Sequence, residues 1–294
     1  MINKITILNI LIILLIGCQS REKQEATKDE QKTVLDTSTV IVKYDHTLFT
    51  LPSPYQATSY IKASDLGFNK VLLNPAENAP NYTTNFNKAL NIGIYGTDLG
   101  YLNVYNQTPE VITYFSTIKD LSEDLGIDNA LKEELIHRIE NNIDNEDSLL
   151  YFLSNTYRKF DSYLNDNNRK EIGALIIAGG WIESLYILSQ HAVSSENRNI
   201  INRLGEQKHP LDNLIEILSP YYYKSDEYTE MIDGLVDLAY EYDGIIYNYS
   251  YAEPELLEKE KTTIIHSKSN VIISEYHLRT IANKVSSIRN NIIH

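Results

Sequence analysis

A stretch near the middle of the chain, residues 172–188, is apolar on nearly every face of the helix that its periodicity predicts. A helix that is apolar all round is buried, so this segment belongs at the centre of the fold and other elements must surround it. It contains the run GALIIAGG, and a second segment, residues 89–105, has glycines at positions 93, 96 and 100. Glycine inside a helix costs about 1 kcal/mol relative to alanine, so we expect these glycines to let two helix backbones pack closely.

Each of these two segments also carries a carboxylate among apolar residues: Asp98 in residues 89–105 and Glu183 in residues 172–188. A buried carboxylate must be paired, hydrogen-bonded or protonated. One hypothesis makes Asp98 and Glu183 the catalytic residues of an acid/base or metal-dependent hydrolase. The other has hydroxyl groups satisfy them and fix the register of the helices, and we favour it because structural networks also hold buried acids.

Helical periodicity, N-cap residues and glycine stops predict about eight helices, and their short polar connections favour antiparallel neighbours. The predicted helices cover residues 53–66, 84–105, 108–126, 129–140, 146–164, 168–191, 196–208, 225–242 and 274–292. Pro210 either kinks the helix over 196–208 or begins a new one that runs to residue 218. A divergent helical repeat is the alternative, although the element lengths vary too much for a regular repeat of about 34 residues.

The C-terminal part of the chain has a different pattern. Residues 245–251 alternate at period two with aromatic side chains, which predicts a strand. Residues 262–266 and 271–273 flank a polar turn and predict a hairpin. The expected fold is therefore mainly α, a multi-helix antiparallel bundle with a small β-appendage at about 245–273. The tyrosine-rich strand could also add an edge to the sheet of a partner.

The first residues have the layout of a secretory signal, because Lys4 precedes an apolar run over residues 5–16. A run of about a dozen residues is too short to span a membrane and fits the apolar region of a signal peptide. It ends in LIGC at residues 15–18, which resembles the lipobox of bacterial lipoproteins. The resemblance implies cleavage after Gly17 and a lipid on Cys18. An ordinary signal peptide with an incidental cysteine, or a short uncleaved anchor, is the alternative.

The segment that follows Cys18 is polar, with balanced charges and no large apolar residue up to Thr33. Such a segment cannot bury enough apolar area to fold alone, so we expect a flexible tether or a fraying helix. The chain would then consist of a signal peptide (1–17), the lipidated cysteine with its tether (18–39) and one helical domain (40–294). An Asp soon after the lipidated cysteine resembles an inner-membrane retention signal. Neither Gln19 nor Ser20 is Asp, so we expect an outer-membrane anchor, facing the periplasm or the cell exterior.

Composition excludes several classes of function. The net charge is −14, and a surface that acidic repels nucleic acid. The single cysteine leaves no partner for an intrachain disulfide. The chain has no HExxH, GxSxG, GxGxxG or P-loop motif, so the sequence predicts no metal site and no cofactor.

Three short motifs look familiar: YGTDLGY (residues 95–101), GWIESLY (180–186) and LGEQK (204–208). Together with the lipobox they resemble a family of uncharacterised bacterial lipoproteins of about this length. The resemblance covers nearly the whole mature chain. Because the family has no known activity, it implies no catalytic residue.

The motifs contain the candidate binding residues, which are Tyr95, Tyr101, Trp181 and Glu206. For Trp181, a place in the core is the alternative to a ligand platform. We expect a lipid-anchored binding or scaffold protein of the cell envelope. Its expected partners are the lipid bilayer, through Cys18, and an envelope protein. The hydrolase is the alternative, although the sequence leans away from an enzyme.

Overall fold

The computed structural model of the chain describes residues 39–44, 47–52, 54–127, 169–257 and 262–294. These residues belong to one compact unit and form eight α-helices and six short strands, so the mainly helical fold is as predicted. In chain order the helices are α2 (Pro54–Ala63), α3 (Asn85–Val104), α4 (Thr108–Asp124), α7 (Lys170–Ser195), α8 (Arg198–Gly205), α9 (Lys208–Leu218), α10 (Asp226–Tyr242) and α11 (Glu275–Ile293). The helices predicted over 129–140 and 146–164 lie outside the described residues.

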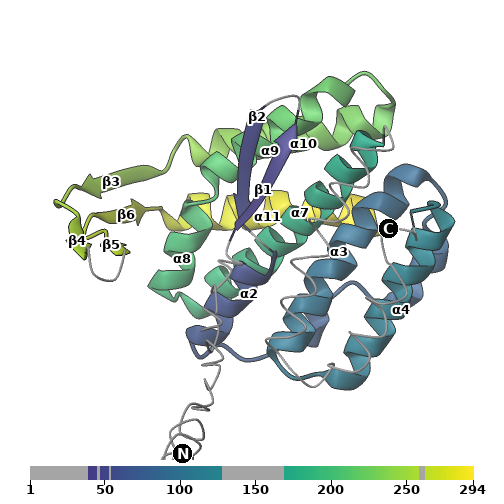
Figure 1. The fold of residues 1–294 in the computed structure, drawn as a ribbon, viewed down its shortest axis with the longest axis horizontal. Helices are drawn as coiled ribbons and strands as arrows, with labels where there is room; N and C mark the ends of the chain where they lie inside the picture. Colours follow the sequence, from purple (N-terminus) through teal and green to yellow (C-terminus); the bar gives the residue numbers. More distant parts are fainter. Residues whose placement is uncertain (1–38, 45–46, 53, 128–168, 258–261) are drawn as a thin grey trace, which may run out of the picture. The chain divides into compact units, whose positions relative to one another are not determined.

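Helix α7 occupies the centre of this unit, as its sequence predicts. Helices α2, α3, α8, α9 and α11 all pack against it (Figure 1). By length and composition α7 could cross a membrane, but 89% of its apolar window is buried inside the protein. Its apolar character is therefore explained by its neighbours, which cover it on all sides.

Helices α3 and α7 approach each other through their glycines. A Cβ atom on Gly93 would overlap the carbonyl oxygen of Ile176 and would lie 2.5 Å from the backbone nitrogen of Gly180. A Cβ atom on Gly179 would overlap the carbonyl oxygen of Leu90. The predicted close approach of the two backbones is confirmed at Gly93 and Gly179. It is wrong for Gly100, where an added Cβ would meet no atom within 4 Å.

Pro210 begins a new helix rather than kinking an old one. Helix α8 ends at Gly205, and α9 begins at Lys208. Pro210 is then the third residue of α9, in the first turn, where its missing N–H needs no helical partner. The connector before α3 contains two short 3-10 helices, η1 (Lys70–Leu72) and η2 (Ala76–Asn81).

The strands form small antiparallel pairs. Strand β1 (Thr39–Tyr44) pairs with β2 (Thr47–Pro52), and β2 lies beside α9. Near the C-terminus β3 (Ile246–Ser250) pairs with β6 (Lys268–Ile272), and β4 (Glu255–Leu257) pairs with β5 (Thr262–Ile264). Strands β4 and β5 thus both lie between β3 and β6 in the sequence. We call residues 246–272 the β-appendage (Figure 1).

The hairpin predicted over 262–273 is wrong in its pairing. Residues 262–264 pair with β4, whereas residues 268–272 pair with β3. The cause is visible at Ser267, the first residue of the predicted turn. Its hydroxyl donates to the carbonyl of Ala252 and accepts from the N–H of Ala252, both at 3.1 Å, and so extends the β3–β6 pair. The apolar cross-strand pair of Ile246 with Ile272 also favours the longer ladder.

Candidate functional site

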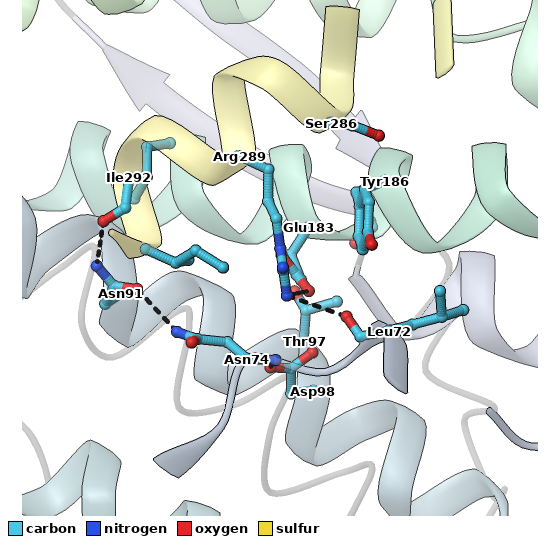
Figure 2. A network of polar contacts seen from close by, with 12 residues as sticks. Leu72, Asn74, Asn91, Thr97, Asp98, Glu183, Tyr186, Ser286, Arg289 and Ile292 are labelled. Atoms are coloured by element: carbon cyan, nitrogen blue, oxygen red, sulfur yellow. Dashed lines mark hydrogen bonds and ion pairs between the residues drawn. The ribbon is translucent and has the colours of Figure 1, made fainter. Parts of the chain in front are cut away.

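Glu183 is neutralised by an arginine from the last helix. The side chain of Glu183, in α7, is fully buried, and that of Arg289, in α11, is 5% exposed. Arg289 donates from Nε to Oε2 at 2.9 Å and from Nη2 to Oε1 at 3.0 Å, which is a two-pronged ion pair (Figure 2). Nη2 also donates to the carbonyl oxygen of Leu72 at 3.0 Å, and the guanidinium lies 4.5 Å from the ring centre of Tyr186. Burial alone would lower the pKa of Arg289, but the charge of Glu183 raises it above its usual value.

Asp98 lies beside this pair and is fully buried. Its Oδ2 accepts the backbone N–H of Asn74 at 3.0 Å, while Oδ1 has no hydrogen-bond donor among the described residues. Burial raises the pKa of Asp98 well above its usual range, and the negative charge of Glu183 raises it further. Arg289 and the Asn74 N–H act in the opposite direction without offsetting these effects. The fold therefore favours a protonated Asp98.

Two asparagines extend the network to the end of the chain. The Asn74 amide donates to Oδ1 of Asn91 at 3.1 Å and to the hydroxyl of Tyr82 at 3.0 Å. The Asn91 amide donates to the carbonyl of Ile292 at 3.2 Å (Figure 2). We call this network the polar core; it consists of Asn74, Asn91, Asp98, Glu183 and Arg289.

The two predicted tyrosines lie in the interior rather than at a surface. Tyr95 and Tyr101 are both fully buried in α3. The Tyr95 hydroxyl donates to the carbonyl of Pro75 at 3.0 Å. The Tyr101 hydroxyl accepts the backbone N–H of Asn69 at 3.0 Å and lies 3.1 Å from Nε2 of His191. Burial lowers the pKa of His191, which favours the neutral ring, and the tautomer of that ring sets which of the two groups donates the hydrogen bond. Both tyrosines hold the connector of η1 and η2 against α3.

Neither carboxylate of the polar core faces one of the pockets described for this unit. Glu183 is held by Arg289, Asp98 is sealed at 0% exposure, and neither carboxylate lines any of the three pockets described for this unit. A general acid or base must lie within hydrogen-bond reach of its substrate. Within the described residues no group of three potential metal ligands is found either. This geometry favours the structural reading of Asp98 and Glu183 over the hydrolase.

The other two candidate binding residues, Trp181 and Glu206, line one pocket. It has a volume of about 160 Å³ and opens among α2, α7, α8 and α9. Arg203 also lines this pocket; it donates from Nη1 to Oε2 of Glu206 at 2.8 Å, and its guanidinium covers the ring of Tyr60 at 4.0 Å. Trp181 is only 4% exposed and belongs to the hydrophobic core, as the alternative for this residue predicted. Three of the four candidates are therefore core residues, and Trp181 and Glu206 line the pocket.

Sequence reasoning missed Arg289, the residue that neutralises Glu183. In the helix predicted over 274–292, Val285, Ile288 and Ile292 lie at the spacing of an apolar stripe. Arg289 lies four residues after Val285 and three before Ile292, so it occupies a position on the same stripe. In the structure Arg289 is buried, whereas Ile288 is only partly buried. A charged residue at a stripe position was the available signal for a buried ion pair.

Exposed apolar side chains gather on the β-appendage. Eight of the thirteen large hydrophobic residues that are exposed in the described part of the chain lie there. They are Ile246, Tyr247, Tyr249, Tyr251, Leu256, Ile264, Ile265 and Ile272. The base of the appendage is fixed to α8, because the Tyr247 hydroxyl donates to the carbonyl of Gly205 at 2.7 Å. A firm base beneath an apolar surface is typical of an interaction site.

Comparison of the chain with models of protein families, with curated proteins and with solved structures finds no match. Cys18, the predicted lipidation site, lies outside the described residues. What defines the candidate sites is therefore their own geometry: a sealed polar core, a pocket beside α8 and an exposed apolar appendage.

Proposed function

We propose that the chain is a lipid-anchored protein of the bacterial cell envelope that docks a partner protein through its β-appendage. The observation that carries this proposal is the concentration of exposed apolar residues there. Large apolar patches on a soluble surface mark sites of protein or membrane contact. The eight exposed residues of the appendage, four of them isoleucines and three of them tyrosines, concentrate exposed apolar surface there.

The pairing of the strands supports docking by strand addition. Each sheet in the appendage has two strands. In the described structure β3 and β6 pair with each other, so each strand uses only one of its two edges. An unpaired edge offers N–H and C=O groups to an extended segment or a sheet edge of another protein. Tyr249 and Tyr251, which are 67% and 72% exposed, would pack on the partner's side chains.

The lipid anchor rests on the sequence of residues 15–18, which resembles a lipobox. A diacylglyceryl group on Cys18 with an acylated amino terminus would hold the chain stably, because two or more acyl chains are needed for lasting attachment. The polar segment after Cys18 would separate the helical domain from the bilayer. Docking would then bring the partner to the membrane.

Site-specific photocrosslinking in the native host tests the docking. A photoreactive phenylalanine analogue replaces Tyr249 in one full-length variant and Tyr240 in another. Tyr240 lies on α10 and is 69% exposed, so the two positions are matched in exposure. We expect one dominant adduct with a β-sheet-containing envelope protein from position 249, and none from position 240. The same adducts from both positions, or none from either, contradict the proposal.

Replacing Cys18 with Ala tests the anchor. We expect the variant to keep its signal peptide and to lose the acyl label that the wild type incorporates. A normally processed and membrane-bound Cys18→Ala protein rules out the lipobox.

A further inference from the structure

Two adjoining hollows lie along α8. The first, of about 160 Å³, lies between α7 and the helices α2, α8 and α9. The second, of about 280 Å³, lies between α2 and α8. They share Tyr60, Arg203 and Glu206, and we call them together the α8 pocket. Each is smaller than the roughly 300–1,000 Å³ of sites for drug-sized ligands, so a ligand of one or two rings is the size that fits.

The α8 pocket has no net charge. Arg203 and Glu206 are the only arginine, lysine, aspartate or glutamate among its lining residues, and they pair with each other at 2.8 Å. The whole chain carries a net charge of −14, so an anion is repelled over long range and finds its only cation already paired. An electrically neutral ligand suits this site best.

The Arg203–Glu206 pair presents polar groups to the α8 pocket. The two side chains line both hollows and are 40% and 33% exposed, so a ligand can reach them. Of the five N–H groups of Arg203, one donates to Glu206. The pocket thus has hydrogen-bond donors beside the carboxylate of Glu206, which is an acceptor. A hydroxyl group is both, so a ligand with several hydroxyls can satisfy them together.

The remaining wall is apolar. Leu185 and Leu188 of α7 line the first hollow, together with Ala57, Pro210 and the ring of Tyr60. A sugar ring has a rim of hydroxyls and flat faces of C–H groups, which matches polar groups beside an apolar wall. We propose that the α8 pocket binds a neutral saccharide of one or two rings.

Trp181 supplies the measurement, because it is the only tryptophan in the chain. Its fluorescence therefore reports on the α8 pocket alone. The full-length lipidated protein, in a detergent without a sugar headgroup, is titrated with glucose, galactose, N-acetylglucosamine, maltose and cellobiose. We expect a saturable change in emission with at least one of them, and weaker binding of glucuronate than of glucose.

Two matched arginine variants control for folding. Arg203→Ala should weaken saccharide binding by about tenfold or more, since it removes charged hydrogen-bond donors at the pocket. Arg279→Ala removes an arginine of the same kind, paired with Glu275 on α11 and outside the pocket, and should leave binding unchanged. Saturation by no sugar, equal affinity in both variants, or binding of free amino acids instead of sugars overturns the proposal. None of these results depends on docking at the β-appendage.

Discussion

The protonation state of Asp98 follows from where its side chain lies. It is fully buried beside Glu183, and its pKa is raised well above the usual range, first by burial and then by the charge of Glu183. In the unfolded chain the same carboxyl titrates near pH 4. Between these two pKa values the folded state binds more protons than the unfolded state, so stability falls as the pH rises from about 4 towards the folded pKa.

The variant Asp98→Asn should remove this loss of stability at higher pH. An asparagine imitates the protonated acid, because its oxygen can accept the Asn74 N–H and its side chain carries no charge. We expect the stability of the variant to increase relative to that of the wild type as the pH rises above about 4, the pKa of the carboxyl in the unfolded chain. Urea unfolding over a series of pH values measures the difference. A constant difference at every pH would show that Asp98 is ionised in the folded protein.

Replacing Glu183 with its amide should be far more damaging than replacing Asp98 with its amide. Glu183→Gln leaves the guanidinium of Arg289 buried without a counter-charge, and breaking a buried pair in this way costs about 3–5 kcal/mol. The double variant with Arg289→Met leaves no unpaired charge, so we expect it to lose less stability than the two single variants combined. The free energies of unfolding of the wild type, the two single variants and the double variant form a double-mutant cycle. Simple additivity in this cycle would mean that the two residues act independently.

At the scale of elements, the crossing of α3 and α7 depends on two glycines. Gly179→Ala would place a methyl group on the carbonyl oxygen of Leu90, and we expect it to destabilise the protein by about 1–3 kcal/mol or more. Gly100→Ala is the matched control on α3, because no atom lies within 4 Å of the added Cβ. It should be neutral or raise the melting temperature, since alanine favours a helix by about 1 kcal/mol. Similar melting temperatures for the two variants would contradict the close crossing.

The elements that could be predicted correctly are those whose determining residues lie close together in the sequence. The glycine pattern and the apolar period of residues 172–188 lie within one segment, and they correctly predicted a buried central helix. The strand partners of the β-appendage depend on residues some distance apart, such as Ala252 with Ser267, and the predicted hairpin was wrong.

The candidate sites show the same limit. The sequence singled out Asp98 and Glu183 as buried acids, but their partners come from distant segments. Arg289 lies 106 residues beyond Glu183, and Asn74 lies 24 residues before Asp98. The tertiary fold alone brings these side chains together. In the same way, no local pattern indicated that Trp181 and Glu206 would line one pocket with Arg203.

At the scale of the whole molecule, the tip of the β-appendage should be dispensable for folding. Ser250 and Lys268 are paired in register, so an Asn-Gly turn can replace residues 251–267 and close β3 onto β6. Most of the removed residues that the structure describes are exposed. Val271 is kept, and its side chain packs closely on Gly205, where an added Cβ would overlap it. We expect an unchanged melting temperature and weaker docking of the partner. A large drop in melting temperature would place the tip in the folding unit.

The distance along the chain between Arg289 and its partners has a consequence for folding during synthesis. Its side chain joins Glu183, 106 residues earlier, and the carbonyl of Leu72, 217 residues earlier. Until α11 has left the ribosome, α7 carries an acid without its arginine partner, which opposes closure of the core around it. Closure of the core should therefore follow the synthesis of α11.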